Sequence, residues 1–209
     1  MQTPPADHTL IEQIQLGDRA ALGQLLLKHE KRLFNTALRM VSNRDDAAEV
    51  TQEAMLKIIQ HIDAYRSEAQ ITTWMTRIVM NTAVSRLRRR KLRDHVSLDS
   101  ARPARDGDDQ AAALRNVLED SRELGPDCGV EQGEMIRHLH SAIDRLDVDF
   151  RAVLVLRDLR EMDYQQIADV LDVKVGTVKS RLFRARLALR QEMQKLERQP
   201  DPHPVPDNA

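Results

Sequence analysis

The segment Tyr164–Arg186, YQQIADVLDVKVGTVKSRLFRAR, has the spacing of a helix-turn-helix. Such a unit needs a short first helix, a tight turn and a second helix that presents polar side chains to the major groove of DNA. Asp172 falls at the turn, where Asp tolerates a left-handed backbone, and the small Ala168 falls where the two helices cross. The apolar residues expected to lock the helices together are Ile167, Leu171, Val173, Val178 and Leu182.

The second helix of this unit carries polar and basic side chains on its outward side. Hydroxyl, amine and guanidinium groups in that position can donate to base edges and to phosphates. The simpler alternative is a basic amphipathic helix whose charged face only meets the solvent around a helical bundle. Against this alternative, the turn, the small residue and the basic face occur together at the spacing that a helix-turn-helix requires. We therefore predict a DNA-binding set of Thr177, Lys179, Ser180, Arg181, Phe183 and Arg184.

A row of acidic and polar side chains lies on the helix expected to follow Asn43. Asp46, Glu49 and Glu53 share one face at spacings of three and four residues, and Gln52 lies beside them. The residues alone leave two interpretations open: a solvated acidic face, or a docking surface for a basic partner.

A polar stripe on a later helix runs into a basic block. In the block Arg86–Arg93 six of eight residues are basic, which suits phosphate binding. An RNA-binding adaptor would explain this block but would leave the helix-turn-helix without a use. The stripe, at spacings of three and four residues, consists of Trp74, Arg77, Asn81, Ser85 and Arg88.

Patterns typical of enzymes and metal sites are missing from the sequence. His138 and His140 are two apart on an expected helix and point in different directions, so we interpret them as surface histidines. The single cysteine, Cys128, excludes an internal disulfide and a multi-thiolate zinc site. The aspartates around Gly107 lack the downstream glutamate of a calcium loop. We predict no catalytic residue, no metal and no cofactor.

The elements that position these residues are expected to be helices. The chain has 209 residues, of which 41% are hydrophobic, 31% charged and only 3% aromatic, a balance that favours helix over sheet. Proline is absent between Ala6 and Arg102 and between Asp127 and Gln199, which predicts two helical domains. The sequence shows neither a signal peptide nor an apolar run that could span a bilayer. We therefore expect a soluble, cytoplasmic protein without membrane insertion.

We predict an all-α fold of two small helical domains joined by a flexible acidic linker, the C-terminal domain being the helix-turn-helix. The segment from Asp94 to Glu134 contains eleven acidic residues and four arginines, which gives it a local charge of −7. The expected bounds are 10–93 for the first domain, 94–130 for the linker, 131–198 for the second domain and 199–209 for a disordered tail.

Helix-start signals define the elements within both domains. Thr9 and Glu12 fit a capping box, and Asp18 fits the cap of a helix that runs to about Val41. Asn43 and Thr72 fit the caps of the next two helices. In the second half we expect helices at 131–146, 149–159, 164–171 (capped by Asp163) and 175–198.

The segment VGTVKSRLFRAR closely resembles the promoter-reading helix of bacterial RNA polymerase sigma factors of the extracytoplasmic-function (ECF) type. The segments LFNTALRMVSNRDDAAEVTQEAMLKII and TTWMTRIVMNTAVSRLRRRK resemble the melting and core-binding domain of the same family. The resemblance covers both domains and leaves only the linker and the termini unmatched. It implies an alternative sigma factor that binds core RNA polymerase, recognises the minus-thirty-five and minus-ten elements, and melts DNA.

The resemblance also implies partners for each surface. Asp46, Glu49, Gln52 and Glu53 would dock on the coiled coil of the largest polymerase subunit, although Glu49 stands where the family often has aspartate. The C-terminal domain would bind promoter DNA and touch the flap of the second-largest subunit. Family members are often held by an anti-sigma factor, which makes such an inhibitor an expected partner here.

For minus-ten recognition and melting, the resemblance points to the first-domain residues Tyr65, Ile71, Trp74, Arg77, Asn81 and Arg88. Flipping a base out of the duplex requires a pocket and a partner that compensates for lost stacking. We expect Trp74 to pack under the loop 65–71 rather than to stack on a base. Ser85 replaces an aspartate frequent in relatives, which leaves the role of that position open.

The main alternative is a helix-turn-helix activator that binds duplex DNA without joining core polymerase. The second domain alone would permit that function. The paired core-binding and melting segments of the first domain argue against it, because an activator does not need them.

Overall fold

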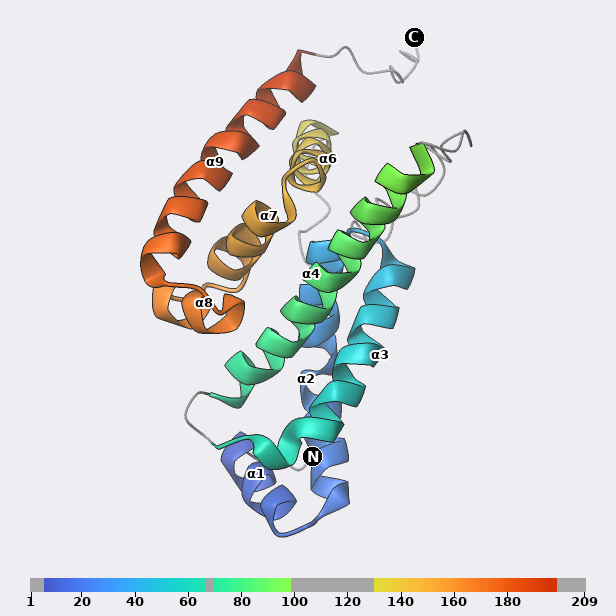
Figure 1. Ribbon diagram of the computed structural model, residues 1–209, viewed down its shortest axis with the longest axis vertical. Coiled ribbons are helices and arrows are strands. Elements are labelled where there is room, and N and C mark those ends of the chain that lie inside the picture. The colour runs from blue at the N-terminus through green and yellow to red at the C-terminus, as the bar shows by residue number, and fades with distance from the viewer. Residues whose placement is uncertain (1–5, 67–69, 99–129, 199–209) are drawn as a thin grey trace.

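The computed structural model describes residues 6–66, 70–98 and 130–198, and every regular element within them is helical (Figure 1). This confirms the predicted all-α class. Most of the expected linker, Cys128, and the tail expected to be disordered lie outside the described residues.

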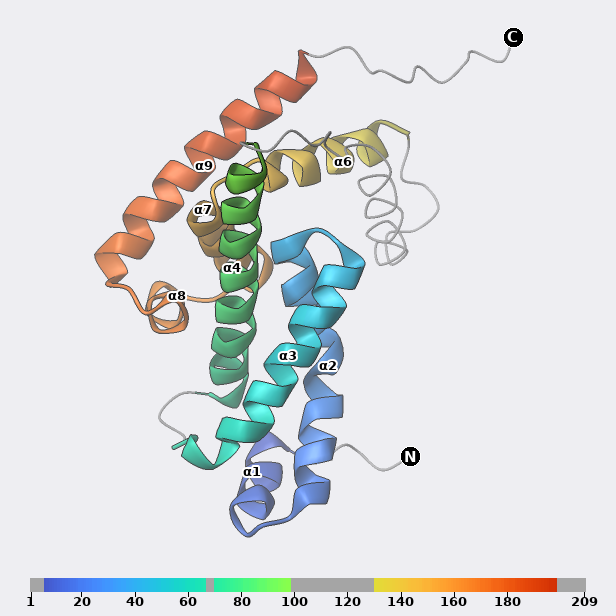
Figure 2. The ribbon, with the colours of Figure 1, turned by 45° about the vertical axis from the view of Figure 1, so that its right-hand side comes forward.

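The N-terminal half forms a bundle in which the long helix α2 packs against both α3 and α4 (Figures 1 and 2). A short 3₁₀ turn, η1 (Ile62–Ala64), follows α3. The four helices are α1 (Asp7–Gln15), α2 (Arg19–Val41), α3 (Arg44–His61) and α4 (Ile71–Leu98).

The C-terminal half places the last helix, α9, against the three helices before it. The segment expected as one helix at 149–159 is α-helical only at first, and its second half is a π-helical turn, η3 (Val155–Leu159). The remaining elements are α6 (Val130–Asp144), α7 (Val148–Leu154), α8 (Tyr164–Leu171) and α9 (Val175–Glu197).

Three of the predicted caps are present. The Asp18 carboxylate accepts from backbone N–H groups in the first turn of α2, and the Asn43 side chain does the same for α3. Asp163 accepts from the Gln166 backbone N–H at 2.8 Å, and the Gln166 side chain accepts from the Asp163 N–H at 3.0 Å. This reciprocal capping box satisfies two backbone donors that the helix itself leaves unpaired.

Two predicted helix starts are wrong, because tertiary contacts begin both helices earlier. Helix α1 starts at Asp7, whose carboxylate lies 2.8 Å from the Lys28 ammonium, so Thr9 stands inside the helix. Helix α4 starts at Ile71, which is buried, so Thr72 stands in its first turn. At both sites packing overrides the local capping signal.

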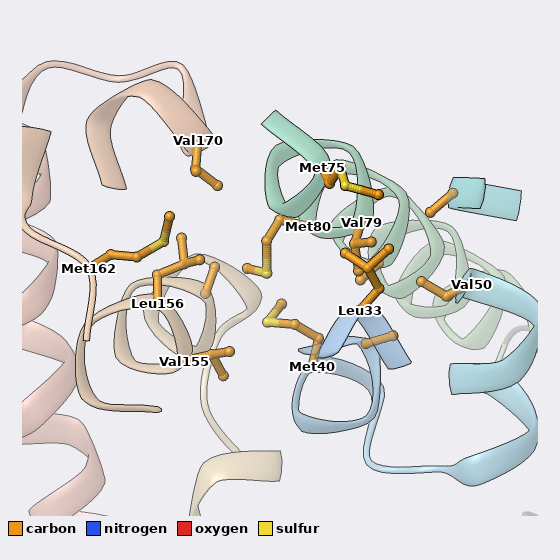
Figure 3. Packing of buried hydrophobic residues seen from close by; sticks show 14 of the residues in the cluster. Leu33, Met40, Val50, Met75, Val79, Met80, Val155, Leu156, Met162 and Val170 are labelled. Atoms are coloured by element: carbon orange, nitrogen blue, oxygen red, sulfur yellow. The ribbon is translucent and has the colours of Figure 1, made fainter. Parts of the chain in front are cut away.

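One buried apolar cluster runs through both halves of the chain. Figure 3 shows Met40 and Met80 from the N-terminal half facing Val155, Leu156 and Met162 from the C-terminal half. Burying a side chain of this size stabilises a fold by about 1.5–3 kcal/mol. The two halves therefore pack together, with α4 lying against both α7 and α8 (Figure 2).

Candidate nucleic-acid interface

Helices α8 and α9 form the predicted helix-turn-helix. Asp172 ends α8 with a φ of 53°, the left-handed conformation expected at the turn. Ile167 and Val178 are fully buried between the helices, and Leu182 is 3% exposed. Ala168 is also buried, which lets the two backbones approach closely. The apolar residues thus fix the angle at which α9 leaves the domain.

The outward face of α9 carries four of the six predicted DNA-binding side chains in solvent. Lys179, Ser180 and Arg184 are exposed, and Phe183 is 74% exposed. Thr177 is half-buried, and its carbonyl accepts from the Ser180 hydroxyl at 3.0 Å. This face offers cations, a hydroxyl donor and an aromatic ring side by side.

Two aromatic rings support the cations of this face. The Lys179 ammonium lies 5.8 Å from the centre of the Tyr164 ring, and the Arg184 guanidinium lies 5.8 Å from the centre of the Phe150 ring. Such contacts contribute about 0.5–1 kcal/mol at exposed sites and restrict the side chains. Sequence reasoning missed both roles, although Tyr164 opens the helix-turn-helix segment.

Arg181, the sixth predicted residue, is already paired. Its guanidinium lies 3.1 Å from one carboxylate oxygen of Asp149, on α7. The other oxygen of Asp149 accepts from Arg88 of α4 at 2.8 Å. One carboxylate therefore connects the helix-turn-helix with the polar stripe of the N-terminal half.

The polar stripe on α4 is exposed along most of its length. Arg77, Asn81 and Arg88 reach solvent, while Trp74 is half-buried. The Trp74 ring lies 5.5 Å from that of Tyr65, between ring centres, so it packs against the residue that begins the expected loop 65–71.

Tyr65 and Ile71 are 8% and 4% exposed, respectively. Because both side chains are buried, they support the start of helix α4 and are not available to contact a nucleic acid. Burial of this kind depends on neighbours far along the chain, which the local spacing does not reveal.

The acidic row on α3 is held in place by Arg86, a residue assigned from sequence only to the basic block. Its Nε donates to the Asp46 carboxylate at 3.1 Å, and its Nη1 lies 2.6 Å from Glu49. Burial alone would lower the pKa of Arg86, but the hydrogen bonds to Asp46 and Glu49 outweigh it and raise that pKa. Arg86 therefore stays charged and fixes α3 against α4.

The far end of the acidic row has its own cation. Glu53 accepts from Lys57 at 2.7 Å, and this hydrogen bond lowers the pKa of Glu53. Gln52 is exposed beside it. Two large apolar side chains follow on the same helix, Leu56 at 55% and Ile59 at 44% exposed. The row is thus a mixed acidic, amide and apolar surface.

His140 is not the free surface histidine expected from sequence. Its ring accepts from the Arg39 guanidinium at 2.9 Å, across the contact between the two halves. Burial, and then the charge of Arg39, lower the pKa of His140 against the opposing effect of Asp144.

Within the described residues, His, Cys, Asp and Glu side chains form no group of three or more that could hold a metal. Over the same three ranges, no helix combines the length and apolarity that crossing a membrane requires.

Comparison with known proteins matches each half of the chain to a family. Residues 25–93 match Sigma-70 region 2, and residues 136–189 match Sigma-70, region 4. The RNA polymerase sigma-H factor of Pseudomonas aeruginosa is 33% identical over 201 residues, covering 95% of this chain and 100% of that protein. The ECF RNA polymerase sigma-E factor of Escherichia coli is 31% identical, covering 92% and 96%.

Solved structures share the fold. The sigma factor RpoE from Bartonella quintana, in complex with the anti-sigma factor NepR, matches with a TM-score of 0.57 and 23% identity over 84% of this chain and 98% of its own. CnrH, in complex with the cytosolic domain of CnrY, matches with a TM-score of 0.59 and 23% identity over 91% and 99%.

The two matched regions and the helix-turn-helix define a transcription initiation factor of bacterial RNA polymerase. The chain belongs to the ECF family of sigma factors. It is an alternative sigma factor, and sigma factors are DNA-binding regulators rather than enzymes. The alternative of an activator that acts without polymerase is not favoured, because region 2 is matched as well as region 4 and the relatives over the whole chain are sigma factors.

Proposed function

We propose that the two halves of this sigma factor divide the work of initiation. Residues 10–93 would bind core polymerase and the melted minus-ten element, and residues 131–198 would read the minus-thirty-five element as duplex. The observation that carries the proposal is the face of α9, where Lys179, Ser180 and Arg184 reach solvent while Val178 and Leu182 are buried against α8. A helix presented in this way fits the major groove.

The minus-thirty-five reading would rest on Lys179, Ser180, Phe183 and Arg184. Arginine and lysine donate to guanine edges and to phosphates, and an exposed ring contacts sugar or the thymine methyl group. The groove beside these residues extends the same basic and apolar face, since it is lined by Tyr164, Lys179, Leu182, Phe183, Arg186, Leu187 and Arg190.

The acidic row of α3 would dock core polymerase. Glu49, Gln52 and Glu53 give the surface its charge and hydrogen-bond acceptors, and Leu56 and Ile59 give it exposed apolar area. Protein interfaces combine such an apolar area with a polar rim. A basic coiled coil of the largest subunit is a complementary partner.

The stripe on α4 would meet the minus-ten element. Arg77, Asn81 and Arg88 are the exposed members, which suits contact with phosphates and with an unpaired base. The buried Tyr65 and half-buried Trp74 would shape the adjoining segment rather than stack on DNA.

An anti-sigma factor is the proposed regulator, and the cytoplasm is the proposed site of action. The two solved structures named above are complexes, one of them with an anti-sigma factor. We expect such an inhibitor to contact both helical halves of the chain.

A run-off transcription assay tests the division of labour. Core polymerase of Pseudomonas aeruginosa is a suitable partner, because the sigma-H factor of that organism matches this chain along its whole length. The template is a library of short promoter fragments. We expect transcripts that require this protein and that share two upstream elements when sequenced.

One variant tests the role of the C-terminal half in that assay. In the Arg184→Ala variant, transcription from promoters that depend on the upstream element should be lost, while binding to core polymerase should be retained. Transcripts that share only a minus-ten element, and are unaffected by Arg184→Ala, would contradict the role proposed for α9.

A further inference from the structure

A buried cation without an acceptor lies at the end of the η3 turn, outside the promoter and polymerase surfaces proposed above. The Nε and Nη2 atoms of Arg160 are buried and have no hydrogen-bond partner in the described part of the chain. Buried polar groups are almost always paired, and leaving a buried charge without a partner is strongly unfavourable. Arg160 therefore needs an acceptor that the described residues do not supply.

A second arginine adds to the positive charge at this place. Arg32 of α2 is exposed, and its guanidinium forms no hydrogen bond or ion pair within residues 6–66, 70–98 and 130–198. Helix α2 contacts η3, so the charge of Arg32 reaches Arg160. Burial, and then this charge, lower the pKa of Arg160 to about 10, and no carboxylate offsets the two effects. Two cations thus share one site without a counter-ion.

The carboxylates nearest in sequence do not neutralise this pair. The Asp158 carboxylate is engaged by Arg186, whose Nη2 lies 2.7 Å away. Glu161 directly follows Arg160, but it is exposed and its carboxylate forms no ion pair with another described residue. The site is therefore open to an anion that does not belong to these neighbouring side chains.

The backbone that carries Arg160 is unusual and is held in place. The Arg160 N–H donates to the Val155 carbonyl at 3.0 Å, five residues back, as in a π-helical turn. Glu161 then has a φ of 55°, a left-handed conformation that is unfavourable for a residue other than glycine. The Arg157 guanidinium donates to the Met162 carbonyl at 2.7 Å and closes the turn. Because π-helical turns are frequent at functional sites, this geometry supports a binding role for Arg160.

The two guanidinium groups suit a small anion that carries a phosphate group. An arginine presents a planar fork of donors to two phosphate oxygens at once, and a doubly charged phosphate matches two arginines. Turning the Arg160 guanidinium towards such a ligand breaks no hydrogen bond of its Nε or Nη2 atoms. Arg160 is half-buried and Arg32 is exposed, which gives the anion access. A DNA backbone contacts donors at the surface, so the buried donors favour a small ligand.

We propose that Arg32 and Arg160 form a binding site for a small phosphate-bearing anion between α2 and the η3 turn. The site lies outside the promoter-binding and polymerase-binding residues and does not depend on their roles. The bound phosphate group would supply the acceptors that Arg160 lacks, so the anion should stabilise the folded chain.

Titration calorimetry and thermal unfolding of the full chain test the site with inorganic pyrophosphate as the probe. Millimolar pyrophosphate should raise the melting temperature above that in sodium chloride of the same ionic strength. In Arg160→Met the rise should disappear, and the affinity for pyrophosphate should fall about tenfold or more. Arg160→Lys keeps the charge but loses the fork of donors, so its affinity should be intermediate.

Two further measurements separate loss of the site from loss of the fold. Without pyrophosphate, Arg160→Met should melt no lower than the parent, because methionine leaves no buried donor unpaired. Arg19→Met is the charge-matched control, since Arg19 is exposed on α2 and forms no ion pair with another described residue. This control should bind pyrophosphate as the parent does.

The source of the phosphate group is distinguished by titrating glycerol 3-phosphate and inorganic phosphate alongside. Binding of either one that is lost in Arg160→Met supports the site and shows whether it accepts a phosphate ester or the inorganic anion. Equal pyrophosphate affinities of the parent, Arg160→Met and Arg19→Met would overturn the proposal.

A DNA contact is the competing explanation for Arg160, and duplex binding at low salt tests it. Weaker duplex binding by Arg160→Met than by Arg19→Met would assign Arg160 to DNA and overturn the small-anion site. Pyrophosphate binding is measured without polymerase or promoter DNA. A failed run-off assay alongside pyrophosphate binding that depends on Arg160 therefore counts against the proposed function alone.

Discussion

Region 2 holds the charges of its acidic row in ion pairs, whereas region 4 leaves most charges of its reading face in solvent. Arg86 contacts both Asp46 and Glu49, while Lys179 and Arg184 lie against aromatic rings and form no ion pair among the described residues. The α3 surface is therefore positioned by electrostatic contacts between helices. The α9 surface is positioned mainly by apolar packing, and although Arg181 and Arg186 are ion-paired, the charges of Lys179 and Arg184 remain available to a ligand.

The difference suits the two kinds of partner. A protein surface must keep a fixed shape to match another protein, and ion pairs between α3 and α4 supply that rigidity. A DNA-reading helix gains from side chains that adjust to base edges and phosphates once the helix itself is fixed. Four pairs of substitutions test this contrast, from the largest expected effect to the smallest.

Truncation of a buried apolar side chain should have the largest effect on the free energy of unfolding, and this effect should be equal in the two regions. Ile167→Ala in the helix-turn-helix and Ile58→Ala in α3 each remove a fully buried side chain. Each should lower the free energy of unfolding by about 2–5 kcal/mol. Urea unfolding followed by circular dichroism measures this, and because both regions share one core we expect a single transition. Two separate transitions would contradict the shared core.

Removal of Arg86 should affect region 2 more than removal of a neighbouring cation. Arg86→Met leaves Asp46 and Glu49 without their common partner and should cost about 1–2 kcal/mol of unfolding free energy. Arg89→Met is the matched control, since Arg89 bonds only to the Ser85 carbonyl, at 3.2 Å, among the described contacts. Equal losses in the two variants would show that Arg86 has no special positioning role.

The cap of α8 should contribute a smaller amount to region 4. Asp163→Ala removes the bond that its carboxylate accepts from the Gln166 N–H, keeps its own backbone N–H, and should cost about 1 kcal/mol. Asp169→Ala, an exposed change on the same helix, should cost less than half of that. Thermal unfolding of the two variants at equal concentration compares them directly, and a reversed order would reject the role of the cap.

The exposed pair in region 2 should have the smallest effect, and that effect should depend on pH. Because the folded pKa of Glu53 is below the ordinary value of 4.5, its contribution is present above 4.5 and is lost as pH falls through the folded pKa. Lys57→Met should cost about 0.3–0.5 kcal/mol more at pH 7 than well below that pKa, because the hydrogen bond of Lys57 to the Thr82 hydroxyl, at 3.1 Å, does not depend on the charge of Glu53. Lys57→Arg keeps the charge and should retain the benefit. A cost that does not change with pH would assign the effect to packing.

The helix-turn-helix was predictable from sequence because its determinants are local. Ala168, Asp172 and the apolar residues around them lie within one short segment, so their spacing alone defines the unit. The caps at Asp18, Asn43 and Asp163 were predictable for the same reason.

Features that depend on distant residues were not predictable. The contacts of Arg86 with Asp46 and of Asp149 with Arg88 join residues 40 and 61 positions apart. The burial of Ile71 likewise moved the start of α4 ahead of the expected cap at Thr72. Local spacing shows which residues share a face, but not which other face will cover them.

The central claim, that the two regions bind different partners, is tested most directly by affinities measured on the same two variants. Glu53→Lys and Arg184→Ala are each titrated with core polymerase and with a duplex carrying the minus-thirty-five element identified by run-off transcription. We expect Glu53→Lys to weaken only core binding, and Arg184→Ala to weaken only duplex binding, by about 5- to 150-fold. Comparable loss of both activities in each variant would contradict the division of labour.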